Sequence, residues 1–229
     1  MSVTPIVALD VPAVDMALAI VDELGDTCHF YKIGSELFTA AGPAIVREVR
    51  HRGADVFLDL KFHDIPNTVA GAVRSAASLG ARLVTVHAVG GATMIGAAAK
   101  AAGDRCDVLA VSVLTSLDET DVAVLWGRER ELRITDEVLR LATIARDSGA
   151  AGLVCSGREA RAVKDWFGPS FLVLIPGIRL PEGAANDQSR TSTPETAVAA
   201  GADYVVLGRA VTSAPDRRAA MNEMRARLG

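Results

Sequence analysis

Short apolar runs of strand length recur along the chain, and segments with helical spacing separate them. Most of these runs are continuous rather than alternating, which is typical of strands that are buried on both faces of a parallel sheet. The runs predict eight strands, at Ile6–Asp10, Phe30–Gly34, Val56–Lys61, Leu83–His87, Val108–Leu114, Gly152–Cys155, Leu172–Pro176 and Tyr204–Gly208.

The segments between these runs predict amphipathic helices. Val14–Leu24 and Glu137–Arg146 each place their apolar residues on one face. Gly-Ala pairs stand just ahead of several strands, where a glycine suits the end of a helix. Eight strand–helix units within 229 residues are typical of an α/β fold of the (β/α)8 TIM barrel type, so we predict that residues 1–229 form a single barrel domain.

Two predicted connections are longer than the others. Thr115–Arg133 follows the fifth strand and is rich in charge, whereas Gly177–Thr193 follows the seventh and is rich in glycine, proline and polar residues. Loops of this length in a compact fold are often functional, and in a barrel both would emerge at the carboxyl ends of the strands, where active sites lie. No Gly-x-Gly-x-x-Gly sequence follows the first strand, which weakens the alternative of a dinucleotide-binding sheet.

Composition and charge narrow the classes of partner. Half of the residues are hydrophobic but only 4% are aromatic, which argues against a stacking surface for single-stranded nucleic acid. The net charge of −4 disfavours binding to nucleic acid or to an anionic membrane. No apolar run reaches the roughly 18 residues of a membrane span. The three cysteines are widely spaced, so we expect reduced thiols in a cytoplasmic protein.

The third predicted strand carries full charges within an apolar run. Side chains alternate along a strand, so Asp59 and Lys61 are expected on the same side, and Asp64 follows three residues later. Buried charges are costly unless they are paired. A structural ion pair and a functional pair that faces a pocket both account for this pattern.

Polar residues stand at the carboxyl ends of most of the other strands. Asp10 could cap a helix, Lys32 could extend its amine to solvent, and His87 is better interpreted as a core histidine. Their shared position at one end of the barrel nevertheless predicts an active site there. The residues concerned are Asp10, Lys32, Asp59, Lys61, His87, Thr115 and Arg209.

The exit from the eighth strand is typical of a phosphate site. Gly208 lets an anion approach the backbone, and Arg209 can make a two-pronged contact. A metal site is not predicted, because the four histidines lack ligand spacing and Asp59 is followed by Lys61 rather than by a second carboxylate. The sequence indicates neither a Ser–His–Asp nor a Cys–His arrangement.

The chain resembles the orotidine 5′-phosphate decarboxylase family in one highly specific sequence, Asp59-Leu60-Lys61-Phe62-His63-Asp64-Ile65-Pro66-Asn67-Thr68. Shorter segments match the family in the same order, so that the resemblance covers residues 8–209. They are Ala8-Leu9-Asp10, Tyr31-Lys32-Ile33-Gly34, Val86-His87-Ala88-Val89-Gly90-Gly91, Val113-Leu114-Thr115-Ser116, Pro176-Gly177-Ile178-Arg179, Asp187-Gln188, Thr193-Pro194 and Gly208-Arg209.

This resemblance implies a dimeric barrel that decarboxylates orotidine 5′-monophosphate to UMP, the last step of de novo pyrimidine synthesis, without cofactor or metal. It implies that Lys61 protonates C6 of the pyrimidine. Lys61 would lie in an alternating row with Lys32, Asp59 and Asp64 of the partner subunit. Ile65 and Thr68 would also reach across the dimer interface.

The resemblance also assigns the substrate contacts. Asp10 and Lys32 would hold ribose hydroxyls, Thr115 would contact the base, and Pro176 is a further substrate-binding residue. The loop 177–193 would close over the phosphate, and it has Asn186 where the family commonly has glycine. Asparagine tolerates positive φ, so we expect the turn to survive. The residues around the phosphate would be Arg179, Gln188, Gly208 and Arg209.

Two other functions are weighed against this one. A sister decarboxylase of sugar phosphates, such as 3-keto-L-gulonate 6-phosphate decarboxylase, resembles the chain around Asp59 but uses magnesium. That family typically has a glutamate at the position of Lys32. The cationic Lys32 of this chain would repel the metal, which disfavours this alternative. A regulator that only binds nucleotides would be expected to have lost charged members of the site, and none is missing.

Overall fold

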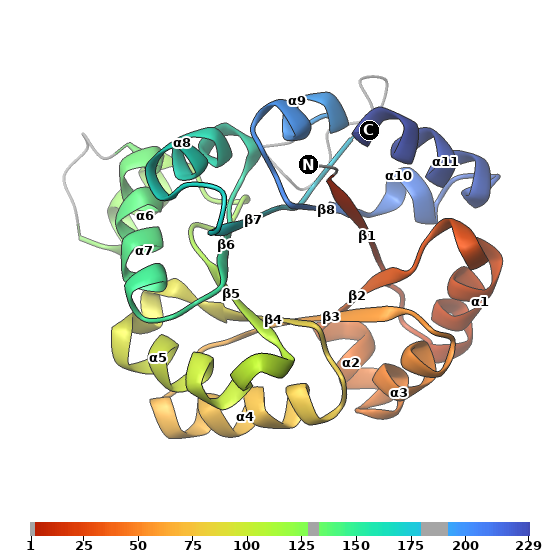
Figure 1. Ribbon diagram of the computed structural model, residues 1–229, viewed down its shortest axis with the longest axis horizontal. Coiled ribbons are helices and arrows are strands. Elements are labelled where there is room, and N and C mark those ends of the chain that lie inside the picture. The colour runs from red at the N-terminus through yellow and green to blue at the C-terminus, as the bar shows by residue number, and fades with distance from the viewer. Residues whose placement is uncertain (1–2, 128–132, 180–191) are drawn as a thin grey trace.

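The computed structural model describes residues 3–127, 133–179 and 192–229. Within these residues, parallel strands pair in chain order and close into a barrel, because β8 pairs with both β7 and β1 (Figure 1). This arrangement confirms the predicted (β/α)8 barrel. The strands are β1 (Thr4–Ala8), β2 (Phe30–Gly34), β3 (Asp55–Phe62), β4 (Leu83–His87), β5 (Asp107–Val111), β6 (Gly152–Val154), β7 (Leu172–Ile175) and β8 (Tyr204–Leu207).

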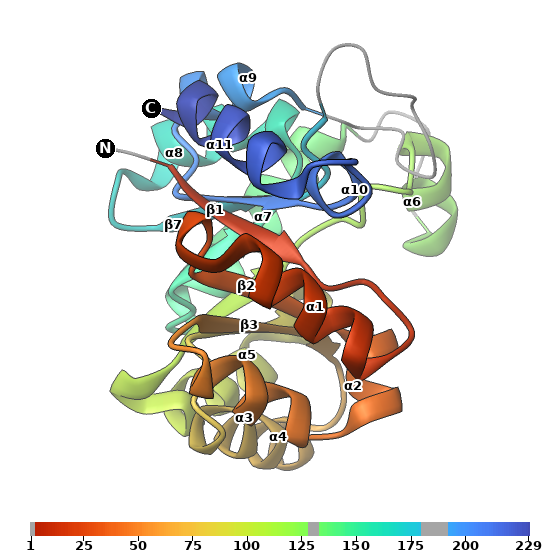
Figure 2. The same ribbon diagram turned by 90° about the vertical axis from the view of Figure 1, so that its right-hand side faces the viewer.

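Helices surround the barrel on its outside (Figures 1 and 2). Among the described residues, none of them is long and apolar enough to cross a lipid bilayer. The helices are α1 (Val14–Leu24), α2 (Ser35–Ala41), α3 (Ala44–His51), α4 (Pro66–Ser78), α5 (Gly91–Ala102), α6 (Glu119–Leu125), α7 (Ile134–Asp147), α8 (Gly157–Phe167), α9 (Pro194–Ala199), α10 (Arg209–Thr212) and α11 (Arg217–Leu228), with 3-10 turns η1 (Gly25–Thr27), η2 (Ala88–Gly90) and η3 (Gly103–Arg105).

Most strand residues are apolar because both faces of the strands are buried. Alternate strand residues, such as Ile6 and Phe57, form one cluster that contains residues from the strands alone and fills the barrel. The residues next to them, such as Val7 and Leu58, belong to a second cluster that includes the inner faces of the helices. Two concentric cores therefore explain the continuous apolar runs of the sequence.

Five strands end earlier than predicted: β1 by two residues, β5 by three, and β6, β7 and β8 by one residue each. β1 ends at Ala8 and β5 ends at Val111, so Asp10 and Thr115 lie in the loops that follow these strands. The neighbouring strand β6 ends at Val154, and the N–H of Ser112 lies 3.2 Å from the Val154 carbonyl oxygen. The apolar run of the sequence continues beyond Ser112, whereas the neighbouring strand β6 ends at Val154.

The connection Thr115–Arg133 contains a helix, α6, which the sequence analysis did not predict. A capping box begins this helix: the Asp118 side chain accepts the Asp121 N–H at 2.9 Å, and the Asp121 side chain accepts the Asp118 N–H at 3.1 Å. The Asp-x-x-Asp spacing was therefore the missed signal. Of the other long connection, the structure describes residues 177–179 and 192–193.

Candidate active site

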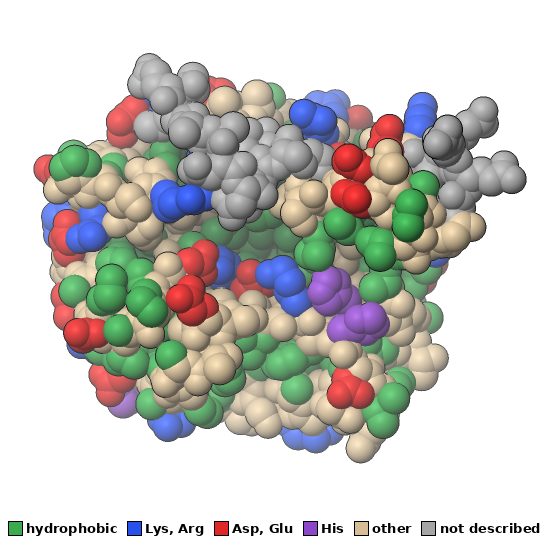
Figure 3. Space-filling view, turned by 180° about the vertical axis from the view of Figure 1, so that it is seen from behind, with side chains coloured by type: hydrophobic (Ala, Val, Ile, Leu, Met, Phe, Trp, Pro, Cys, Tyr) green, Lys and Arg blue, Asp and Glu red, His purple; other side chains and the backbone are tan. Residues whose placement is uncertain are grey.

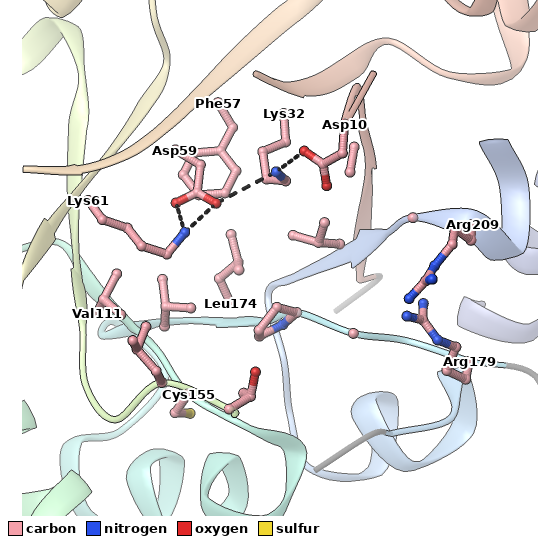
Figure 4. A pocket seen from close by; sticks show the side chains of 18 of the residues that line it. Asp10, Lys32, Phe57, Asp59, Lys61, Val111, Cys155, Leu174, Arg179 and Arg209 are labelled. Atoms are coloured by element: carbon pink, nitrogen blue, oxygen red, sulfur yellow. Dashed lines mark hydrogen bonds and ion pairs between the residues drawn. The ribbon is translucent and has the colours of Figure 1, made fainter. Parts of the chain in front are cut away.

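A cavity of about 450 Å³ opens at the carboxyl ends of the strands, which is the predicted place of the active site. Apolar residues of the inner core, such as Phe57 and Leu174, line its depth (Figure 4). Figure 3 shows a hollow on one face of the molecule, where acidic, basic and histidine side chains gather. The predicted site residues that line the cavity are Asp10, Lys32, Asp59, Lys61, Thr115, Pro176, Arg179, Gly208 and Arg209.

Strand β3 is irregular where it reaches this cavity. Leu58 pairs with Val84 and Phe62 pairs with Val86, so three residues of β3 lie opposite the single residue Thr85 of β4. An insertion of this kind is a β-bulge, which bends a strand and redirects its side chains. The bulge thus decides how the charged part of β3 faces the cavity.

Lys61 lies in the bulge with φ of 49°, the sole positive φ of a non-glycine residue among those described. This left-handed region is uncommon for a long side chain and often marks a functional site. The sequence analysis predicted from regular strand alternation that Asp59 and Lys61 share a side. That reasoning was wrong, because the strand is not regular between these residues. The two side chains do meet, but through a distorted backbone.

Four charged side chains alternate in sign along one side of the cavity (Figure 4). The Lys32 Nζ lies 2.7 Å from the Asp10 Oδ1 and 3.7 Å from the Asp59 Oδ2. The Lys61 Nζ donates to both oxygens of Asp59 at 2.9 Å. The side chains of Lys32 and Asp59 are 10% and 12% exposed, against 38% for Lys61 and 58% for Asp10, so the centre of this charge row is buried and its ends are open.

Asp59 is held in its charged form by its neighbours. Burial alone would raise the pKa of this carboxyl group, but the charges of Lys61 and Lys32 and hydrogen bonds from Lys61 and Thr85 outweigh burial and lower the pKa. The Asp59 carboxylate therefore stays negative at neutral pH although its side chain is nearly buried.

Gly34 gives the charge row its space. A Cβ atom at this position would lie 3.0 Å from the Asp10 Oδ1 and 3.1 Å from the Lys32 Nζ. Both distances are shorter than ordinary van der Waals contacts. The glycine at the end of β2 therefore lets the Asp10–Lys32 ion pair pack directly against the backbone.

Two arginines form a second charged region, across the cavity from the charge row. The guanidinium groups of Arg179 and Arg209 point toward one another (Figure 4). The N–H of Arg179 donates to the Ser192 carbonyl oxygen at 2.9 Å, which ties this arginine to the residues ahead of α9. A Cβ atom at Gly208 would lie 4.0 Å from the Arg179 Nη1, an ordinary van der Waals contact, so Gly208 lies beside this arginine. Two facing cations favour an anion between them.

The residues that were predicted to reach another subunit do not line this cavity. Asp64, Ile65 and Thr68 are exposed at the start of α4. The Asp64 carboxylate accepts the Ile65 N–H at 2.6 Å, and Ile65 is 67% exposed. Within the described part of one chain, Asp64 is therefore not a member of the charge row.

His87 lies beside the site rather than in the core. Its ring is half-buried, and its centroid is 5.6 Å from that of His63. Burial and the nearby charges of His63 and Lys61 lower the pKa of His87. The interpretation of His87 as a core histidine was therefore wrong.

Gln188 and Asn186 lie outside the described residues, so their predicted places stay predictions. Among the residues that the structure describes, no group of three or more His, Cys, Asp or Glu side chains could hold a metal ion. Sequence reasoning missed Gly34 and Thr85; the signal for Thr85 was a hydroxyl within the apolar run of β4.

The chain is similar to known proteins over nearly its whole length. Residues 4–224 match the family described as "Orotidine 5'-phosphate decarboxylase / HUMPS family". The curated orotidine 5'-phosphate decarboxylase of Moorella thermoacetica is 45% identical over 97% of this chain and 91% of its own length. That of Halorhodospira halophila is 49% identical over 94% of this chain and 91% of its own length.

Solved structures agree with the sequence comparisons. The crystal structure of orotidine 5'-phosphate decarboxylase from Lactobacillus acidophilus superposes with a TM-score of 0.86 at 35% identity, and the match covers 100% of both chains. The Pyrococcus horikoshii enzyme of the same name gives a TM-score of 0.79 at 25% identity, over 98% of this chain and 99% of that chain. From the family match, the relatives and the shared barrel, it follows that this chain belongs to the orotidine 5'-phosphate decarboxylase / HUMPS family.

Proposed function

We propose that this protein decarboxylates orotidine 5′-monophosphate to UMP, and that it does so without a cofactor or a metal ion. The observation that carries the proposal is one cavity with a charge row on one side and two facing arginines on the other. Such a cavity can hold a reacting ring at the charge row and a phosphate at the arginines. Membership of the family selects orotidine 5′-monophosphate among the substrates with this shape.

In the proposed reaction, the bond between C6 of the pyrimidine and its carboxylate breaks. Carbon dioxide leaves, and the electron pair stays on C6. The ammonium group of Lys61 stabilises this developing negative charge and then donates a proton to C6, which gives UMP. The neutral amine regains its proton from solvent, consistent with a side chain that is 38% exposed.

Asp59 has two roles in this proposal. It holds the Lys61 Nζ through two hydrogen bonds of 2.9 Å, so the ammonium group is in place before the reaction starts. Its own charge, maintained by the two lysines, faces the place where the substrate carboxylate departs. Repulsion between two carboxylates would favour the loss of carbon dioxide.

The remaining residues bind the substrate in the proposal. Arg179 and Arg209 take the phosphate, with Gly208 beside them and Gln188 as a further predicted contact. Asp10 and Lys32 hold the ribose hydroxyls, and Thr115 and Pro176 lie beside the base. Binding energy from the distant phosphate can then be used to orient the reacting ring. These contacts fit the positions of the described residues around the cavity.

We further propose a homodimer that shares its active sites. Ile65 is 67% exposed and Val89 is 41% exposed, so both apolar side chains are accessible to a partner subunit. Asp64 and Thr68 are exposed near Ile65, beyond the mouth of their own cavity. The partner's Asp64 would extend the charge row past Lys61. The cytoplasm, where UMP synthesis would take place, stays the predicted location.

The direct test is the absorbance of the pyrimidine band after orotidine 5′-monophosphate is added. We expect the absorbance to fall as UMP forms, at the same rate with and without a metal chelator. No fall would indicate a protein that only binds nucleotides. A fall that the chelator abolishes would contradict the metal-free mechanism. The position of Lys32 supports that mechanism, because its ammonium group lies in the charge row and would repel a metal ion.

Replacing Lys61 tests the proton donor. Lys61→Ala is expected to abolish measurable turnover while the barrel stays folded, because the ammonium group serves the transition state and is not part of either core. The same absorbance assay and a thermal melt measure both properties. Lys100→Ala, which removes an exposed lysine of α5, is the matched control and should leave turnover unchanged. Substantial turnover by folded Lys61→Ala would rule out the assigned role.

Mixing two inactive variants tests the shared site. Lys61→Ala and Asp64→Ala are each expected to be inactive, because each lacks one member of the extended charge row. After subunit exchange, a heterodimer has one site with both changes and one site with neither, so mixing should restore activity at one of its two sites. Activity is measured after exchange has been verified with differently tagged subunits. An exchanged mixture that stays inactive contradicts shared sites.

Replacing Arg209 tests the phosphate site. Arg209→Ala should lower kcat/KM for orotidine 5′-monophosphate by roughly 100-fold or more, because a charge-assisted contact is lost. With the nucleoside orotidine, which has no phosphate, the same change should cost little. Arg161→Ala removes an arginine whose ion pair with Asp165 lies on the surface of α8, and it is the control for net charge. Equal losses on both substrates would show that Arg209 is structural.

A further inference from the structure

Thr85 stands at the one irregular place in the pairing of β3 and β4. The strand β4 supplies only this residue between its pairs with Leu58 and Phe62, whereas β3 supplies three. The side chain of Thr85 is fully buried, and its neighbours in the strand, Val84 and Val86, are apolar. A buried hydroxyl group needs hydrogen-bond partners, and the bulge provides them.

The hydroxyl group of Thr85 joins the two residues at the centre of the proposed chemistry. It accepts the backbone N–H of Lys61 at 2.9 Å and lies 2.9 Å from the Asp59 Oδ1. The first contact uses a lone pair of the oxygen, and the carboxylate can only accept, so the hydroxyl proton is directed to Asp59. Both hydrogen bonds therefore have a fixed direction.

The first hydrogen bond stabilises an unusual backbone. Lys61 has φ of 49°, and the bulge turns its N–H away from the regular ladder. A buried N–H without a partner is costly, and Thr85 supplies the acceptor. The second hydrogen bond fixes the Asp59 carboxylate, which in turn binds the Lys61 Nζ. Backbone and side chain of Lys61 are thus both tied to one hydroxyl group.

We propose that Thr85 is a positioning residue for the decarboxylation: its hydroxyl group holds the strained backbone of Lys61 and the carboxylate of Asp59 in a fixed relation. This inference rests on the proposed function, but it also predicts a property of Asp59 that can be measured without substrate. Loss of the hydroxyl group removes a donor to the carboxylate, so Asp59 should take up a proton at a higher pH.

The other charged and titratable groups that face Asp59 set the background for this measurement. They come from β1 to β4 or from the loops that follow these strands, and a variant that changes only the Thr85 hydroxyl group leaves their number and type unchanged. These groups are Asp10, Lys32, Lys61 and His87.

Three variants separate positioning from packing. Thr85→Val keeps the size and branching of the side chain but removes the hydroxyl group, whereas Thr85→Ser keeps the hydroxyl group. Thr27→Val is the matched control, because the Thr27 hydroxyl is also buried and donates to the Leu24 carbonyl oxygen at 2.6 Å, ahead of β2 and outside the proposed site. If Thr85→Val fails to fold, Thr85→Ala is the second variant without a hydroxyl group.

The measurements are kcat, KM, the pH profile of kcat/KM, and the titration of the Asp59 carboxyl carbon by NMR in the absence of substrate. Thr85→Val should lower kcat by roughly tenfold or more, with little change of KM, because the reacting group and not the substrate is displaced. The acidic limb of the profile and the Asp59 titration should both move to higher pH. Thr85→Ser should restore all of these properties.

Some outcomes would overturn the proposal. They are a Thr85→Val variant with the kcat and the Asp59 titration of the wild type, a Thr85→Ser variant as impaired as Thr85→Val, or a Thr27→Val control with the same shift. A wild-type protein without decarboxylase activity would instead contradict the proposed function. In that case the NMR titration still decides whether Thr85 controls Asp59.

Discussion

The ion pairs around Asp59 constrain the whole carboxyl end of the barrel. At an effective dielectric constant of about 20, opposite charges about 3 Å apart attract by roughly 5 kcal/mol, which is comparable to the several kcal/mol that burial of one ion costs. The two lysines therefore offset much of the free-energy cost of burying the Asp59 carboxylate. Because Lys32 comes from β2 and Lys61 from β3, the register between these strands has to be maintained, and Gly34 has to leave space for the ammonium group of Lys32.

The same ion pairs hold the charged groups of the site in fixed positions. Charges that are fixed by the fold need no rearrangement when negative charge develops on a substrate, which is the main advantage of a preorganised site over water. The arginines lie on the other side of the cavity, so a phosphate can bind without neutralising the charge row (Figure 4). A barrel suits this separation, since each strand can carry one group to the same face while two apolar cores hold the strands rigid.

The sequence predicted the barrel because strands buried on both faces leave continuous apolar runs, and it predicted Asp59, Lys61 and Arg209 at the cavity because polar residues stood where those runs end. It could not predict the bulge in β3, since a bulge arises from pairing with β4 and not from local pattern. The sequence also could not predict the ion pair between Asp10 and Lys32, because this pair depends on how the loop after β1 packs against β2. The Asp118 capping box, in contrast, was visible in the sequence and was overlooked.

The most direct test of this account is the kcat/KM of Asp59→Asn for orotidine 5′-monophosphate. Asparagine has nearly the same size, so the variant removes the buried negative charge and leaves the packing of β3 in place. If the charge row drives the reaction, kcat/KM should fall by roughly 1,000-fold or more while the thermal melt still shows a folded protein. A folded Asp59→Asn protein whose kcat/KM lies within about tenfold of the wild type would contradict the account.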